Sequence, residues 1–129
     1  MKPETRNRKM RGGGQLMEDL KVRTRSYALR VIKLYDSLAK RGVARVLGDQ
    51  SLRSATSVGA HYREAIRSRS AAEYAAKMNA GLMELEETLY WLELLDHSGV
   101  TPSVKLTALV DETDQRTAIL VKLIKNAKR

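Results

Sequence analysis

The chain has 129 residues and no cysteine, which excludes disulfide bonds and a cysteine nucleophile. Its 24 basic residues against 15 acidic ones give a formal net charge of +9, which favours contact with phosphate backbones or with anionic partners. The length suits one domain. No apolar stretch approaches the roughly 18 residues of a transmembrane helix, and the N-terminus lacks the apolar core of a secretion signal. We therefore expect a cytoplasmic protein without membrane contact.

Residues 1–14 are predicted to form a basic, flexible tail, and residues 15–129 the folded domain. Gly12-Gly13-Gly14 has low helix propensity and is interpreted as a linker. The tail is consistent with an arm that touches nucleic acid, and equally with a solvated leader or with a misassigned start, since Met10 and Met17 are alternative initiators. Its candidate contacts to nucleic acid are Arg6, Arg8, Lys9 and Arg11.

The first helix is predicted to run from Gln15 to Arg41. Six residues recur at steps of four and three, which places them on one face of a helix: Leu20, Thr24, Tyr27, Val31, Leu34 and Leu38. Gly42 is expected to end this helix, and Val43–Leu47 to be a short linker to an antiparallel neighbour.

The second helix is predicted to begin near Gly48 or Asp49 and to end at Ser68-Arg69-Ser70. Its core stripe is Leu52, Ala55, Gly59, Tyr62 and Ile66. Ser70 and Glu73 have the spacing of a capping box, which predicts that a third helix begins at Ala71.

The third helix is predicted over Ala71 to His97, with Gly99 after its end. Its apolar stripe is Tyr74, Met78, Leu82, Leu85, Leu89 and Leu92. Thr101-Pro102 has the pattern of a cap followed by proline at the first helical position, which predicts the start of the fourth helix. The stripe of that helix is Leu106, Leu109, Thr113, Arg116, Leu120, Leu123 and Ala127. Four helices with short connections predict an all-α, antiparallel up-down four-helix bundle.

Two rows of polar residues accompany the apolar stripes of the second and third helices. The first row is Gln50, Arg53, Ser57, His61 and Glu64, and the second is Glu73, Lys77, Ala80, Glu84 and Glu87. If the chain folds back at Ser68-Arg69, Arg53 lies opposite Glu84 or Glu87, and Glu64 opposite Lys77. A solvated charged face is the plain interpretation of such rows. The alternative hypothesis is a partly buried network that sets helix register or subunit contact, in which case replacing Arg53 by Met abolishes assembly or cooperativity.

The segment Gln50–Ala65, QSLRSATSVGAHYREA, resembles the central signature of the bacterial "four helix bundle protein" family. These proteins are related to the intervening-sequence protein of large-subunit ribosomal RNA genes. The resemblance covers about residues 20–125 at the level of helices, and its specific motifs lie within residues 50–95. It continues through Arg67-Ser68-Arg69-Ser70, Glu73-Tyr74, Lys77, Glu84, Glu87-Thr88 and Tyr90–Leu95.

The resemblance implies a ring-like homopentamer with a positively charged surface. A related branch, the accessory variability determinant of diversity-generating retroelements, pairs with a reverse transcriptase and binds nucleic acid. The family usually has Asn where this chain has His61, so any role of that amide does not carry over.

Catalytic and metal-binding interpretations have little support. Metal sites in helical bundles need Glu-x-x-His pairs and further inward carboxylates, and neither His61 nor His97 has a glutamate three residues before it. No nucleophile or phosphate-loop motif is present. We therefore expect no enzyme activity, cofactor or metal. Tyr90 and Trp91 are able to stack on bases, but Trp91 is interpreted as an anchor of a subunit contact.

The expected function is that of a homo-oligomer that binds nucleic acid or serves as accessory subunit to a nucleic-acid enzyme such as a reverse transcriptase. Besides the tail, the candidate phosphate contacts are Arg23, Arg25, Arg30, Lys122, Lys125, Lys128 and Arg129. The alternative is a homo-oligomeric scaffold that binds an acidic protein partner without nucleic acid.

Overall fold

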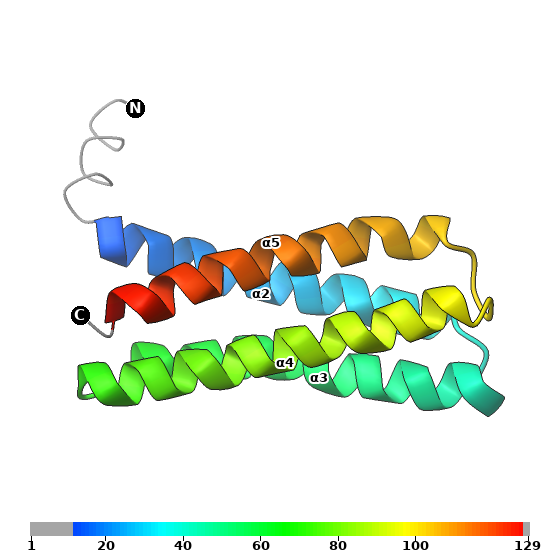
Figure 1. Ribbon diagram of the computed structural model, residues 1–129, viewed down its shortest axis with the longest axis horizontal. Coiled ribbons are helices and arrows are strands. Elements are labelled where there is room, and N and C mark those ends of the chain that lie inside the picture. Colours follow the sequence, from blue (N-terminus) through cyan, green and yellow to red (C-terminus); the bar gives the residue numbers. More distant parts are fainter. Residues whose placement is uncertain (1–11, 128–129) are drawn as a thin grey trace, which may run out of the picture.

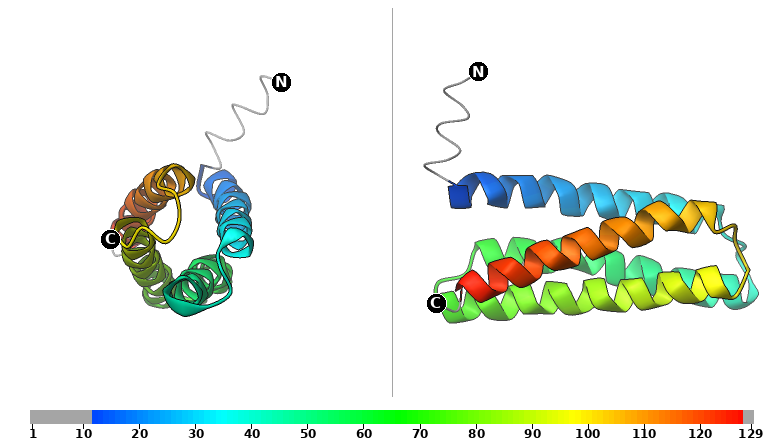
Figure 2. Two further views of the ribbon diagram at one scale, coloured as in Figure 1. Left: turned by 90° about the vertical axis from the view of Figure 1, so that its right-hand side faces the viewer. Right: turned by 45° about the horizontal axis from the view of Figure 1, so that its top comes forward.

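The computed structural model describes residues 12–127, with side chains from residue 18 to residue 126. These residues form four helices: α2 (Gly12–Ser37), α3 (Gly42–Ile66), α4 (Ala71–His97) and α5 (Val104–Ala127). Successive helices run in opposite directions (Figure 1), and the end view shows each helix beside two neighbours (Figure 2, left). The predicted all-α antiparallel four-helix bundle is confirmed.

Helix α2 begins and ends earlier than predicted. The expectation that Gly12-Gly13-Gly14 lies outside the helix is wrong, because α2 starts at Gly12. Glycine disfavours a helix by only about 1 kcal/mol per residue, a cost that the tertiary packing of the adjoining helix can offset. At the other end, the hydroxyl of Ser37 donates to the carbonyl of Leu34 at 2.7 Å. This bond occupies a carbonyl of the last helical turn, and the helix ends at Ser37.

Helix α3 begins at Gly42, so the predicted stop at Gly42 and the predicted linker Val43–Leu47 are both wrong. Gly42 has a φ of 66°, in the left-handed region that favours glycine, and this conformation allows the chain to reverse direction between α2 and α3. Ala44 and Leu47 are buried, which extends the apolar face of α3 by more than a turn beyond the predicted start near Gly48. Tertiary burial therefore explains why this segment is helical.

The apolar face of α3 is displaced by one residue from part of the predicted stripe. Ala55 and Tyr62 are buried as expected. Three other predicted positions are only partly buried: Leu52, Gly59 and Ile66. The residues immediately before them are buried instead: Ser51, Val58 and Ala65. The hydroxyl of Ser51 donates to the carbonyl of Leu47 at 2.9 Å, which explains how a polar residue occupies a core position.

Helix α4 has the predicted bounds, and the predicted cap is present at its start. The backbone N–H of Glu73 donates to the hydroxyl of Ser70 at 3.0 Å. The carboxylate of Glu73 accepts in return from the backbone N–H of Arg69 at 3.1 Å, one residue before the usual partner in a capping box. These two bonds fix the tight turn between α3 and α4.

Replacing Ser70 by alanine is expected to lower the free energy of unfolding by about 1 kcal/mol, because a first-turn backbone N–H loses its acceptor. Urea denaturation followed by circular dichroism measures this change. Ser26→Ala, on the exposed face of α2, is the control and should leave stability within about 0.5 kcal/mol of the parent. Equal effects of the two substitutions would refute the capping role.

Helix α5 begins at Val104, two residues after the predicted proline start. The carbonyls of Pro102 and Ser103 accept the first backbone bonds of the helix, and the hydroxyl of Ser103 donates to the carboxylate of Asp96 on α4. Thr101 is buried under this connection. The bond to Asp96 explains the later start, because it anchors Ser103 and not Thr101 at the N-terminus of α5.

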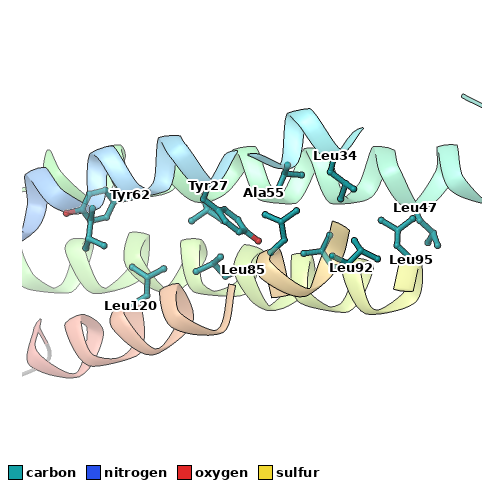
Figure 3. Close-up of a cluster of buried hydrophobic side chains, with 14 of the residues drawn as sticks. Tyr27, Leu34, Leu47, Ala55, Tyr62, Leu85, Leu92, Leu95 and Leu120 are labelled. Atoms are coloured by element: carbon teal, nitrogen blue, oxygen red, sulfur yellow. The ribbon is translucent and has the colours of Figure 1, made fainter. Parts of the chain in front are cut away.

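The core is aliphatic apart from two tyrosines. Figure 3 shows side chains from the four helices meeting along the bundle axis. The largest of those that are fully buried include Tyr27, Tyr62, Leu85, Leu92, Leu95 and Leu120. Burial of the Tyr27 ring raises the pKa of its hydroxyl to about 12. Of the four pairs of neighbouring helices, α3 and α4 make the most extensive contact, and α2 and α5 make the least.

Candidate functional site

The two predicted polar rows lie side by side on the α3–α4 surface. The guanidinium of Arg53 lies 3.5 Å from the carboxylate of Glu84 and also contacts that of Glu87. Glu87 accepts a hydrogen bond from the indole N–H of Trp91 at 3.1 Å. The amide oxygen of Gln50 accepts from Nε of Arg53 at 3.3 Å. The structure therefore brings these five predicted residues together.

The same surface continues toward the α3–α4 turn. Lys77 lies 3.3 Å from Glu64, as the antiparallel pairing predicts. His61 links the two halves, since its ring nitrogens lie 3.4 Å from Glu64 and 3.7 Å from Glu84. Ser57 contributes no side-chain partner to this group; its hydroxyl donates to the backbone carbonyl of Arg53 at 2.8 Å. We call the group the α3–α4 polar cluster: Gln50, Arg53, His61, Glu64, Lys77, Glu84, Glu87 and Trp91.

Close packing beneath this cluster explains why the rows meet. The hydroxyls of Ser54 and Thr88 lie 2.7 Å apart, and both residues are fully buried. A Cβ placed on Gly81 would lie 3.6 Å from the carbonyl oxygen of Val58, so the two backbones approach closely at this point. Small residues on facing helix surfaces thus hold α3 against α4.

The exposure of the polar cluster lies between the solvated face and the partly buried network that the sequence left open. The side chain of Arg53 is 49% exposed and that of Glu84 19% exposed. Surface ion pairs contribute roughly 0–1 kcal/mol, so the cluster adds little to the stability of one chain. The cluster therefore acts mainly by fixing the register between α3 and α4 and by placing polar groups on the surface of this helix pair.

Acid is expected to weaken the bundle through this cluster. The pKa of Glu64 is lowered chiefly by its hydrogen bond from Lys77, and the pKa of Glu87 chiefly by its hydrogen bond from the Trp91 indole. Both carboxylates therefore stay ionised in the folded protein at pH values at which the same residues of the unfolded chain take up protons. The stability that they contribute is present above the ordinary glutamate pKa of about 4.5 and is lost as pH falls through the lower folded pKa values.

Urea unfolding between pH 6 and pH 3 measures this loss. The double variant Glu64→Gln/Glu87→Gln should show a shallower decline of stability with acidification than the parent. Glu86→Gln removes an exposed carboxylate outside the cluster and should leave the decline unchanged. Identical profiles for all three proteins would contradict the assigned contacts.

A second polar cluster, which the sequence did not reveal, joins α2 to α5. The carboxylate of Glu112 contacts Arg30 on α2 and accepts from Arg116 on its own helix at 2.8 Å. Beside it, the hydroxyl of Tyr27 bonds that of Thr113. Glu112 is 8% exposed. Arg30, which was predicted as a phosphate contact, thus pairs with Glu112. Arg116, which belongs to the predicted stripe of α5, pairs with the same carboxylate.

One end of the bundle gathers exposed cations. The α3–α4 turn lies at this end, beside the start of α2 and the end of α5 (Figure 1). We call it the basic end; its exposed or partly exposed cations are Lys21, Arg63, Arg67, Arg69, Lys122 and Lys125. Lys21, Arg63, Arg67 and Ile66 line an open cleft of about 650 Å³ between α2 and α3. Lys21 pairs with the exposed Glu18 at 3.8 Å.

Apart from Arg30, which pairs with Glu112, the predicted phosphate contacts fall into three groups. Lys122 and Lys125 are exposed near the end of α5, and Arg23 and Arg25 are exposed on α2. The remaining ones lie outside the described residues: Arg6, Arg8, Lys9, Arg11, Lys128 and Arg129. Segments 1–11 and 128–129 nevertheless carry six of the nine excess positive charges by sequence. The described residues next to them, Gly12 and Ala127, lie at the basic end (Figure 2, right).

None of the three cleft cations, Lys21, Arg63 and Arg67, is among the phosphate contacts predicted from the sequence. The signal for two of them is the spacing of Arg63 and Arg67 at the C-terminal end of α3. Their spacing of four places them one turn apart on α3, and a like-charge pair at this spacing costs a few tenths of a kcal/mol in an isolated helix.

Within residues 12–127, no group of three or more His, Asp or Glu side chains is placed to hold a metal ion. None of the described helices is long and apolar enough to cross a membrane.

Comparison with known proteins identifies a family and a solved structure of the same fold. The family model of the 23S rRNA-intervening sequence protein matches residues 18–122. A crystal structure from Bacteroides thetaiotaomicron, described as a protein with unknown function from the S23 ribosomal protein family, aligns with a TM-score of 0.75 at 33% identity. The alignment covers 81% of this chain and 97% of that one. No curated protein matches the chain.

Proposed function

Because the chain belongs to the 23S rRNA-intervening sequence protein family, we propose that it is a non-enzymatic homo-oligomer that binds nucleic acid through its basic end, alone or as accessory subunit to a nucleic-acid enzyme such as a reverse transcriptase. The observation that carries this proposal is the cleft lined by Lys21, Arg63 and Arg67. Cations gathered in a concave surface attract phosphate more strongly than the same charges dispersed over a convex one.

The distribution of charge supports the same end of the molecule. In the sequence, the two terminal segments that carry further Lys and Arg residues directly precede α2 and follow α5. The start of α2 and the end of α5 lie at the basic end (Figure 1). Within the described residues, Arg63 and Arg67 make no ion pair, and Lys21 pairs only with the exposed Glu18. In the middle of the bundle, by contrast, Arg53 pairs with Glu84, and Arg30 with Glu112. Contacts of this kind bind the phosphate backbone and carry no base sequence information.

Fluorescence anisotropy with a labelled single-stranded RNA tests the proposal. If each of the three cleft cations neutralises one phosphate, a plot of the logarithm of the binding constant against the logarithm of the salt concentration has a slope of about −2. The affinity for RNA then falls roughly 20-fold between 50 and 200 mM salt. Contributions from the terminal segments make the slope steeper. No binding at low salt, or binding that salt does not weaken, would refute it.

Self-association is proposed on the outer face of α4, and the family resemblance points to a pentamer. Met83 and Tyr90 are 60% and 54% exposed there, although large apolar side chains are usually buried. Trp91 lies beside Tyr90, with the two ring centroids 5.1 Å apart, and its indole is anchored to Glu87. Aromatic residues held in this way are typical anchors of protein interfaces.

Sedimentation velocity measures the assembly. The parent protein should sediment as an oligomer, and both Tyr90→Ser/Trp91→Ser and Arg53→Met should shift the protein toward monomer. Val104→Ser, which removes an 80% exposed apolar side chain at the start of α5, is the control and should leave the mass unchanged. A monomeric parent, or loss of assembly in the control alone, would contradict the assigned face.

An acidic protein partner is the second candidate. Helix α2 exposes an apolar row beside its arginines: Val22, Leu29 and Ile32. Such a mixture of apolar and basic side chains is suited to a protein surface as well as to phosphate. Affinity capture from nuclease-treated lysate separates the two cases, because only a protein partner is retained after the nucleic acid has been digested.

A further inference from the structure

A second pocket lies at the opposite end of the bundle from the basic end. It occupies about 290 Å³ between α2 and α5. Its lining comes from the last two turns of α2 and the first turns of α5: Arg30, Lys33, Leu34, Ser37, Lys105 and Leu109. Of the pairs of neighbouring helices, these two make the least contact, which leaves room for the pocket.

The pocket combines an apolar floor with a basic rim. Leu34 and Leu109 are 6% and 3% exposed and present their side chains as the floor. Lys33 and Lys105 stand on the rim from opposite helices, and both are exposed. No carboxylate is among the lining residues, and of the three lining cations only Arg30 has an acidic partner, Glu112.

The position of Lys105 adds to the positive potential. It lies in the first turn of α5, a turn that contains no acidic residue. The N-terminus of a helix carries a partial positive charge, so a lysine there is unfavourable unless an anion is nearby. The rim therefore favours a negatively charged group.

We propose that this pocket binds a small amphiphilic anion, with a short alkyl chain or a single aromatic ring over Leu34 and Leu109 and a carboxylate or phosphate head between Lys33 and Lys105. The volume of about 290 Å³ is just below the range for small-molecule sites, roughly 300–1,000 Å³, which limits the apolar part of the ligand to a short one. Neither the head nor the body is sufficient by itself, because the lysines are exposed and the floor is small.

Isothermal titration calorimetry with octanoate tests this site. Octanoate should bind with one site per chain, whereas acetate and octanol, which supply the head and the body alone, should bind at least about tenfold more weakly. Octyl phosphate distinguishes a phosphate head from a carboxylate head; tighter binding of either one assigns the head group and supports the site.

Two variants locate the binding. Lys33→Ser/Lys105→Ser removes the rim charges from exposed positions and should weaken octanoate binding at least about tenfold. Lys122→Ser/Lys125→Ser makes the same change of charge at the basic end and should leave it unchanged. Ser37→Trp, which places a large side chain in the pocket, should abolish binding, and circular dichroism verifies that each variant is folded.

The proposal is overturned if neither octanoate nor octyl phosphate binds the folded parent. Equal binding by Lys33→Ser/Lys105→Ser and the parent, or octanol binding as tightly as octanoate, also overturns it.

Discussion

Replacing Glu112 by alanine is expected to lower the free energy of unfolding by about 3–5 kcal/mol, the range found when one partner of a buried ion pair is removed. Glu112 accepts from Arg116 at 2.8 Å and contacts Arg30, so it joins α2 to α5 where these helices have few other contacts. The Arg116 side chain is only 11% exposed, and without Glu112 its guanidinium is left buried beside no carboxylate. Urea denaturation measures the loss.

A double variant separates the cost of an unpaired charge from the net contribution of the pair. Glu112→Leu/Arg116→Met replaces both charges by apolar groups of similar size and should recover most of the stability lost in Glu112→Ala, because exchanging a buried ion pair for apolar packing is often neutral. The neighbouring Asp111, on the exposed side of α5, provides the control: Asp111→Ala should change stability by less than about 0.5 kcal/mol. A loss below about 1 kcal/mol in Glu112→Ala would contradict the role assigned to the α2–α5 cluster.

Reversing two charges in the cleft, Arg63→Glu/Arg67→Glu, is expected to weaken single-stranded RNA binding by about 100-fold at low salt and to reduce the salt slope by about 1.4. Both arginines line the cleft beside Lys21, so two of its three cations become repulsive to phosphate. Anisotropy measured across a range of salt concentrations gives both quantities from one titration series.

Arg41→Glu/Arg45→Glu is the matched control for this experiment. These arginines have the same spacing of four, are also exposed, and lie at the opposite end of α3. The control makes the same change in net charge, so a general electrostatic effect weakens both variants equally. Equal weakening of RNA binding in the two variants would show that the basic end is not the specific contact and that RNA is attracted only by the net charge.

The helices and their main contacts could be predicted where the determinants are local. Ser70 and Glu73 identified the start of α4 because a capping box needs only four consecutive residues. The pairing of Arg53 with Glu84 and Glu87 followed from the antiparallel fold and the tight turn at Ser68-Arg69.

Features that depend on tertiary packing were missed or misplaced. The start of α3 was put too late because Gly42 resembles a helix stop, whereas the burial of Ala44 and Leu47 makes the following segment helical. The spacing of four between Glu112 and Arg116 is visible in the sequence, but the burial of this pair and the contact of Glu112 with Arg30 on α2 depend on tertiary packing. The cleft residues Arg63 and Arg67 were missed for a related reason: Lys21, the third cation of the cleft, comes from α2.

The most direct test of the central claim is to map where RNA contacts the bundle. Photocrosslinking with 4-thiouridine-substituted RNA, followed by mass spectrometry of the crosslinked peptides, reports contacts in the full-length protein. If RNA binds at the basic end, crosslinks should lie around Lys21 and from Arg63 through Arg69, where the cleft lies. Crosslinks confined to the opposite end around Arg41, or no crosslinks at low salt, would contradict the claim.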